Sequence, residues 1–198
     1  MQKLARTDRL DASSADVRRP LGTARVWDPL VRIFHWSLAT SFAVAWLTRH
    51  SWADVHHWAG YAAGALIVLR LIWGFLGTPY ARFTQFVRHP TTIIRYLSDI
   101  LTGREARYLG HNPAGGAMVL VLMAAMAGAA LSGWMMTTDT FYGVSWVEHI
   151  HDLLGNGLLL LVLAHLAGVA LASIRHRENL VRAMISGRKR LPESGDVT

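Results

Sequence analysis

Histidine is the residue type in this sequence with the widest capacity for chemistry. The chain has ten histidines and no cysteine, so disulfides, thiolate metal sites, iron–sulfur clusters and covalently attached c-type haem are excluded. A metal in this chain has to be bound by histidine, methionine or carboxylate side chains. Ionisable groups inside apolar membrane segments are costly and are therefore functional candidates. The histidines that lie inside or at the ends of long apolar segments are His35, His56, His57, His151 and His165.

Two of these histidines have a spacing that suits two sites on one helix. His151 and His165 are fourteen residues apart, which in an α-helix returns both side chains to nearly the same face, about 21 Å apart along the axis. A hydrogen bond to a neighbouring helix explains any single histidine equally well, so the pattern is what favours metal ligation. Two sites at two depths need two further ligands, and His35 and His56 are available for them.

Four long apolar segments position these histidines. Hydrophobic residues make up 52% of the chain and charged residues only 17%, and the apolar residues are grouped in blocks at 30–48, 56–77, 114–136 and 147–174. About 18 or more apolar residues span a bilayer as a helix. Asp28-Pro29 and Asn112-Pro113 are residue pairs of the kind that begin helices. We therefore predict an all-α integral membrane protein built as a four-helix bundle.

The segment between the second and third apolar blocks predicts a helix of another kind. Its apolar residues recur at spacings of three and four, at Ile93, Ile94, Leu97, Ile100 and Leu101. This pattern is typical of an amphipathic helix on the membrane surface. The alternative is a solvated loop with a single helical turn.

The chain divides into three parts on this basis. Residues 1–25 are polar and lack the apolar core and cleavage site of a signal peptide, so we expect a retained, disordered cytoplasmic tail. Residues 26–176 form the transmembrane domain, and residues 177–198 form a basic cytoplasmic tail.

Positive charge is distributed unevenly along the chain. Lys and Arg are concentrated in both tails and in the segment 80–110, whereas the link 49–55 has one Arg and the link 137–147 has none. The positive-inside rule therefore places both termini in the cytoplasm. Because the basic residues lie between apolar blocks, the net charge of +7 favours membrane lipid as a partner and not nucleic acid.

This topology pairs the histidines by depth. His35 falls level with His165 near the cytoplasmic side, and His56 falls level with His151 near the outer side. Small residues lie on the same helix faces, namely Gly60, Gly64, Gly155 and Gly168, although helix packing alone also explains glycines in membranes. Two histidine pairs without carboxylates, on glycine-lined faces, favour a flat macrocycle such as haem over a bare metal ion.

Arg70 is the remaining charged residue deep in the second apolar block. It falls in the cytoplasmic half, on roughly the face of His56. Its side chain can pair with a haem propionate, or it can extend to the membrane surface and place its charge in water.

At these residues the chain resembles the bacterial cytochrome b561 family, which includes the b-type cytochrome subunits of nickel-iron hydrogenases. Of the adjacent histidines His56 and His57, His56 matches the family pattern, because Gly60 and Arg70 follow it at the expected offsets. The family pattern does not make His111 a ligand. The matching elements are Arg32 with Phe34-His35-Trp36, the segment His56-His57-Trp58-Ala59-Gly60 with Arg70, Gly110-His111-Asn112-Pro113, the pair His151 and His165, and His176-Arg177-Glu178-Asn179-Leu180.

The resemblance implies electron transfer across the bacterial inner membrane. It implies two b haems whose iron is bound by His35, His56, His151 and His165. It also implies a link to the quinone pool, ubiquinone or menaquinone, so that the chain is an oxidoreductase or an electron-transfer subunit of one. Proton acceptors for quinol oxidation are available on the outer side, at Asp54, Glu148, His149 and Asp152.

Two alternatives stay open at this point. The first is a haem b anchor subunit that relays electrons for a hydrogenase or for a periplasmic c-type cytochrome. The second belongs to another class, a histidine-lined transporter of metal ions. A transporter needs carboxylates or further polar ligands at mid-membrane, and the apolar blocks offer almost none.

Overall fold

Four long helices dominate the computed structural model, which describes residues 22–197. They are α1 (Pro29–Thr48), α2 (Ala53–Leu76), α5 (Pro113–Met136) and α6 (Ser145–Arg175). All four are long and apolar enough to cross a membrane. The predicted all-α membrane bundle is confirmed. Most of the tail expected at 1–25, namely residues 1–21, lies outside the described residues.

The helices begin where the sequence places capping residues. The side chain of Asp28 accepts a hydrogen bond of 2.8 Å from the backbone N–H of Val31 at the start of α1. The side chain of Asn112 accepts one of 2.6 Å from Gly115 at the start of α5. In both helices proline occupies the first turn, where a backbone N–H has no intrahelical acceptor, so the cap and the proline together fix the helix start.

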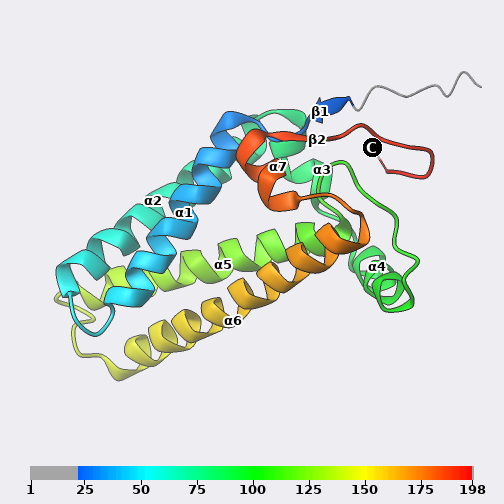
Figure 1. Cartoon of the computed structure of the whole chain (residues 1–198). Coiled ribbons are helices and arrows are strands. Elements are labelled where there is room, and N and C mark those ends of the chain that lie inside the picture. The colour runs from blue at the N-terminus through cyan, green and yellow to red at the C-terminus, as the bar shows by residue number, and fades with distance from the viewer. Residues whose placement is uncertain (1–21, 198) are drawn as a thin grey trace, which may run out of the picture.

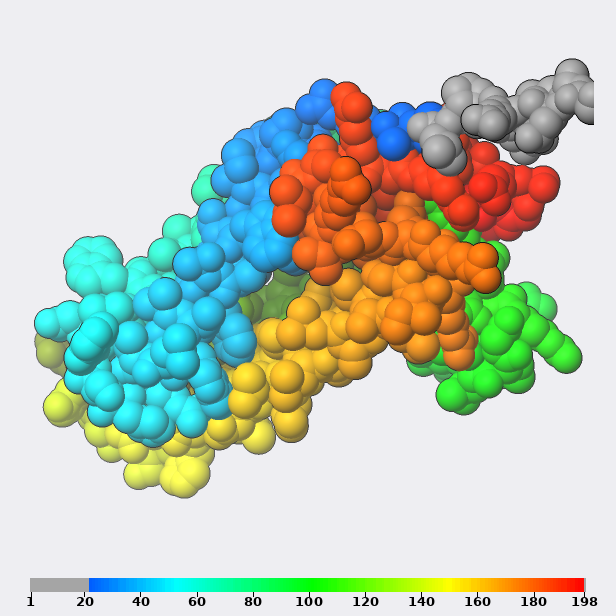
Figure 2. All heavy atoms as spheres, viewed as in Figure 1, coloured from blue at the N-terminus to red at the C-terminus, as the bar shows by residue number. Residues whose placement is uncertain are grey.

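The four helices pack in the order α1, α2, α5, α6, each against the next (Figure 1). The largest buried cluster comes from α2, α5 and α6, and consists of Ala63, Ile67, Met123, Met126, Ala129 and Leu158. Between α1 and α6 the space-filling view shows a hollow, with α5 visible behind it (Figure 2). The bundle is therefore packed on three sides and open between its first and last spanning helices.

The two chain ends meet at one end of the bundle, which we call the sheet end. Strands β1 (Thr23–Arg25) and β2 (Arg188–Arg190) pair in antiparallel fashion, with Ala24 opposite Lys189. Helix α7 (Leu180–Ser186) leads into β2 through Gly187, whose φ of +79° favours glycine. The opposite end of the bundle, with the loops 49–52 and 137–144, is called the loop end.

An ion-pair network stabilises this arrangement at the sheet end. The buried Arg107 donates hydrogen bonds to Glu178 at 2.9 Å and to Asp196. Glu178 also accepts from the backbone N–H of Arg190 at 2.9 Å. Residues 23–25 and 188–190, from the two segments that sequence analysis assigned to the tails, form this sheet.

Three shorter helices connect α2 to α5. They are η1 (Pro79–Ala81), α3 (Phe83–Phe86) and α4 (Pro90–Thr102). The axis of α4 runs crosswise to α5 and α6, so that it is seen nearly end-on in Figure 1. One face of α4 packs inward through Tyr96, while Ile94, Leu97 and Leu101 are exposed. The predicted amphipathic helix at 91–101 is therefore present, and the loop alternative is wrong.

Candidate functional site

Two pairs of histidine rings lie inside the bundle, one toward each end. In the loop-end pair, the ring centroids of His56 on α2 and His151 on α6 are 6.0 Å apart. In the sheet-end pair, the centroids of His35 on α1 and His165 on α6 are 6.4 Å apart. The histidines that sequence analysis paired by depth are thus neighbours in space, across helices that are far apart in the chain.

The spacing within each pair suits one metal ion between two imidazoles. A metal–imidazole nitrogen bond is about 2 Å long, and the nitrogen lies roughly 1 Å from the ring centroid, so two imidazoles on opposite sides of one ion have centroids about 6 Å apart. The separations of 6.0 and 6.4 Å in the two pairs are close to this value. The donor set of each pair is two neutral nitrogen atoms, as haem iron accepts.

Backbone hydrogen bonds fix the tautomer of both loop-end histidines. Nδ1 of His56 lies 2.8 Å from the carbonyl oxygen of Ala45, and Nδ1 of His151 lies 3.0 Å from that of Ala129. A carbonyl oxygen only accepts, so in each ring Nδ1 has the proton and donates it. Nε2 is therefore left with a free lone pair, which is the form of imidazole that binds a metal.

The sheet-end pair has a different environment. Nδ1 of His35 is buried and has no hydrogen-bond partner within the described part of the chain. A buried unpaired nitrogen is unfavourable. In the sheet-end pair, Nδ1 of His35 is therefore still available for a hydrogen bond or for a metal.

Open space lies beside several of the glycines on the ligand faces. A Cβ atom added to Gly60, Gly155 or Gly168 would meet no atom within 4 Å. Gly64 differs, because its Cβ would lie 3.4 Å from that of Ala130, an ordinary helix-packing contact. The first three glycines therefore leave room for a flat group beside the histidines, whereas Gly64 allows α2 to approach α5.

Arg70 is a buried cation near the sheet end. It is 4% exposed, and its Nη2 donates to the carbonyl oxygen of Ala81 at 3.0 Å. Its Nη1 is buried without a partner among the described residues. The guanidinium lies near the rings of Phe34 and Phe83, at 5.9 and 5.3 Å from their centroids. Asp28 is the carboxylate whose charge acts on Arg70, but none of the ion pairs within 4 Å among the described residues includes Arg70.

His111, His57 and His149 belong to neither of the two ring pairs. His111 packs its ring against Trp27 and Phe86, with centroid distances of 4.6 and 4.9 Å. Burial lowers its pKa, and the positive charges of Lys189 and Arg70 lower it further, so the ring is neutral at pH 7. His57 and His149 are both exposed at the loop end.

Sequence reasoning missed two residues of α5 that contact the loop-end pair. The hydroxyl oxygen of Ser132 lies 3.1 Å from Nδ1 of His151. A Cβ added to Gly133 would lie 2.9 Å from Cε1 of His151. The available signal was a polar residue next to a glycine in an apolar segment, but a contact with His151 depends on the rotation of α5 against α6, which hydropathy does not define.

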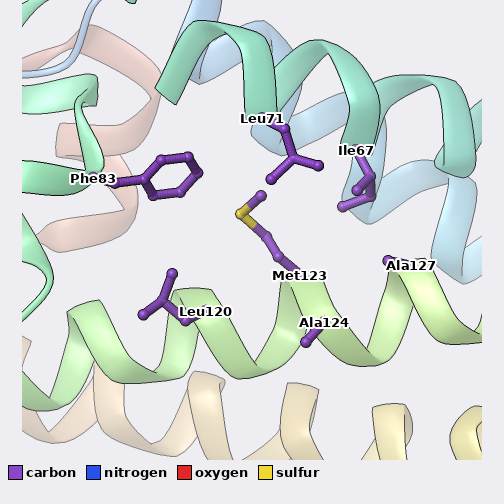
Figure 3. Close-up of a pocket in the computed structure, with 7 residues that line it drawn as sticks. All are labelled: Ile67, Leu71, Phe83, Leu120, Met123, Ala124 and Ala127. Carbon is purple, nitrogen blue, oxygen red and sulfur yellow. The ribbon is translucent and has the colours of Figure 1, made fainter. Parts of the chain in front are cut away.

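A separate apolar groove of about 300 Å³ lies between α2 and α5 (Figure 3). Its lining has no titratable side chain and consists of Ile67, Leu71, Phe83, Leu120, Met123, Ala124 and Ala127. A groove of this composition accommodates a hydrocarbon chain and offers no group for chemistry.

The structure also bears on the transporter alternative. Within residues 22–197 there is no group of three or more His, Asp or Glu side chains that could hold a bare metal ion. Transport of a divalent ion through the bundle needs such polar ligands, so this alternative has no support in the described residues.

A family model described as prokaryotic cytochrome b561 matches residues 26–187, which include both histidine pairs and most of the chain. No curated protein and no solved structure shows significant similarity to the chain.

Proposed function

The chain belongs to the prokaryotic cytochrome b561 family, whose members transfer electrons in membranes by b-type haem, and from this premise we propose that it binds two b haems, one at each histidine pair. His56 and His151 would bind the haem iron at the loop end, and His35 and His165 would bind it at the sheet end. The observation that supports two sites is the repetition of one ring separation, 6.0 and 6.4 Å, at two depths of one bundle. When bound, haem b supplies one-electron redox chemistry.

The role of the chain is to bind and orient these groups and to exclude water. The imidazoles of the two histidine pairs would bind the iron, and Gly60, Gly155 and Gly168 leave space beside them. The spacing of His151 and His165 separates the two sites by about 21 Å along α6. An electron entering at one end of the bundle therefore has a second site at the other end from which to leave.

Arg70 would pair with a propionate of the sheet-end haem. Its unpartnered Nη1 and its burial support this role, because a buried guanidinium needs an anionic partner and a carboxylate matches its geometry. The alternative, extension of the side chain to the membrane surface, fits poorly with a residue that is 4% exposed.

We also propose that the electrons come from or go to the quinone pool. A quinone dissolves in the bilayer and reacts with release or uptake of protons, so a proton acceptor is needed at the membrane surface. Asp54, Glu148, His149 and Asp152 are exposed at the loop end and are candidates. If the pH profile of quinol oxidation were unchanged in Asp54→Asn, Glu148→Gln and Asp152→Asn, these carboxylates would have no part in it.

A partner protein is the alternative route for electrons. The chain would then be a subunit that relays electrons for a hydrogenase or for a periplasmic c-type cytochrome. Purified protein that oxidises quinol with a soluble acceptor and no partner would favour an enzyme, whereas oxidation that requires an added partner would favour the relay.

The haem assignment is tested by counting haem in purified variants. The pyridine haemochrome content and the reduced-minus-oxidised spectrum would be measured on wild type and on single Ala variants of the four ligands. We expect two haems per chain, with His35→Ala and His165→Ala losing one haem and His56→Ala and His151→Ala losing the other. His57→Ala is the matched control, since it neighbours His56 but is exposed. A ligand variant that retains both haems would remove that residue from the set.

A further inference from the structure

Helix α5 is the one spanning helix to which no haem ligand is assigned, yet it touches a proposed ligand. His151 on α6 contacts about one helical turn of α5, through Ala129, Ser132 and Gly133. Ser132 is 4% exposed, which is unusual for a hydroxyl in an apolar span unless it is hydrogen-bonded. The buried hydroxyl of Ser132 is therefore expected to have hydrogen-bond partners.

The hydrogen-bond geometry assigns Ser132 a donor role and an acceptor role. Its hydroxyl donates to the carbonyl oxygen of Gly128 at 2.8 Å, with that of Ala129 at 3.1 Å. Its single proton is thereby used, and its lone pairs remain free. Nδ1–H of His151, 3.1 Å away, donates to the hydroxyl oxygen and shares its proton with the carbonyl oxygen of Ala129 at 3.0 Å.

Gly133 restricts the ring from another side. A Cβ at this position would lie 2.9 Å from Cε1 and 3.3 Å from Nδ1 of His151, so the α5 backbone is in close contact with the imidazole. Contact with the backbone and two acceptors for one N–H leave the ring little freedom to rotate about its χ2 angle.

The other proposed ligands have fewer such contacts in the described structure. His56 donates to one backbone oxygen, that of Ala45, and Nδ1 of His35 is without a partner. Only His151 has a side-chain acceptor among the hydrogen bonds found for these rings. An effect of Ser132 should therefore be confined to the loop-end site.

We propose that Ser132 is a positioning residue that accepts a hydrogen bond from Nδ1–H of His151 and thereby lowers the midpoint potential of the loop-end haem. This inference rests on the proposed function. An acceptor at Nδ1–H increases the negative character of the imidazole and its donation to the metal, and a stronger donor favours the oxidised, ferric state. The backbone acceptor at Ala129 stays in place when Ser132 is changed, so the effect is a shift of potential and not loss of the ligand.

The test is a redox titration of the haem α-bands in purified protein, on wild type and on variants of Ser132. Ser132→Ala removes the acceptor, and we expect an upward shift of the loop-end midpoint with the sheet-end midpoint and both haems retained. Ser132→Thr and Ser132→Val are a matched pair of similar size, of which only Thr has a hydroxyl. We expect Thr to retain the wild-type midpoint and Val to shift it as Ala does.

The outcomes separate this inference from the function on which it rests. If the loop-end midpoint of Ser132→Ala equals that of wild type, or if Thr and Val shift it equally, the tuning role is overturned and the haem assignment is unaffected. If His151→Ala retains both haems in the haemochrome assay, the ligand assignment itself is overturned. The low-spin ferric EPR signal of the loop-end haem provides a second readout, and it should change in Ala and Val but not in Thr.

Discussion

The loop-end histidines are each held by the other helix of their own hairpin. His56 on α2 donates to Ala45 on α1, and His151 on α6 donates to Ala129 on α5. Each hydrogen bond holds the proton on Nδ1 and leaves Nε2 for a metal. At the scale of single residues, the site therefore depends on the close fit between helices as much as on the histidines.

Gly133 offers a sharp test of this fit. Gly133→Ala places a methyl group 2.9 Å from Cε1 of His151, a distance that forces the ring to move. We expect the purified variant to retain the sheet-end haem and to lose most of the loop-end haem, as measured by the haemochrome assay. In the control Gly157→Ala, the new Cβ meets nothing within 4 Å, so both haems should be retained. Full haem content in Gly133→Ala would mean that the ring has more room than the structure indicates.

The role of Arg70 at the sheet end can be tested in the same way, by substitution. Arg70→Gln removes a buried positive charge, and a charge-assisted hydrogen bond contributes about 1.5 kcal/mol or more. We expect the sheet-end haem to dissociate about tenfold faster and its midpoint potential to fall, because a nearby positive charge favours the reduced state. Haem transfer to apomyoglobin and a redox titration measure the two effects.

The control for this experiment is an arginine at the same end of the bundle. Arg82 is exposed, and its Nε donates to the carbonyl oxygen of Gly77 at 2.7 Å. Arg82→Gln should leave the haem dissociation rate and the midpoint close to wild type. Equal effects of the two substitutions would assign the change to net charge and not to the buried guanidinium.

At the scale of elements, α4 has an exposed apolar stripe made of Ile94, Leu97 and Leu101. Because α4 lies crosswise to the spanning helices (Figure 1), we expect this stripe to insert into the interfacial region of the bilayer. Leu101→Asp should increase hydrogen exchange of residues 90–102 in lipid nanodiscs. Thr92→Asp, on the opposite face and in the first turn where an acidic residue is favourable, should not. Equal exchange in the two variants would show that the stripe does not contact lipid.

The ion pairs at the sheet end predict a pH-dependent opening of β2. Burial alone would raise the pKa of the Glu178 carboxyl, but hydrogen bonds from Arg107 and the backbone of Arg190 outweigh it and hold the pKa below its ordinary value. The pKa of Asp196 is likewise lowered. A carboxyl with a lowered folded-state pKa stabilises the fold at neutral pH, and this contribution is lost as the pH falls through that pKa. The protection factors for hydrogen exchange of residues 188–197 should therefore fall below about pH 4.

Substitution of the central arginine gives the same opening at neutral pH. Arg107→Gln leaves two half-buried carboxylates, those of Glu178 and Asp196, without their cationic partner and so destabilises the sheet end. The exchange rates of residues 188–197 at pH 7 should rise accordingly. The control Arg188→Gln removes an exposed arginine from the same strand and should have no such effect. If Arg107→Gln exchanged as slowly as wild type, the network would not stabilise the sheet end.

The parts of the structure that the sequence predicts are those with local causes. Hydropathy and the caps Asp28 and Asn112 define the spans, and helical periodicity defines α4, because each depends on residues near in sequence. The pairing of β1 with β2 joins segments more than 160 residues apart through short polar strands without an alternating pattern. The contacts of Ser132 and Gly133 depend on helix rotation. Neither the strand pairing nor these contacts can be predicted from amino-acid composition or from the periodicity of apolar residues.

At the scale of the whole molecule, the bundle is two hairpins joined along one side. The first hairpin is α1 with α2 and the second is α5 with α6, and α2 packs on α5. Both histidine pairs connect one hairpin to the other, through His35 with His165 and His56 with His151. The proposed haems would therefore close the side on which α1 and α6 stand apart, so that cofactor binding and stability of the bundle are coupled.

The orientation of this bundle in the membrane decides which site meets which aqueous phase. Because the natural chain has no cysteine, single cysteines report exposure without background. Tyr142 at the loop end is 82% exposed, and Arg188 at the sheet end is also exposed, so both are suitable positions for a single cysteine. The basic sheet end should face the cytoplasm. In spheroplasts, a membrane-impermeant maleimide should therefore label Tyr142→Cys at once and Arg188→Cys only after lysis. The reverse pattern would invert the protein and place the His35–His165 site next to the outer aqueous phase.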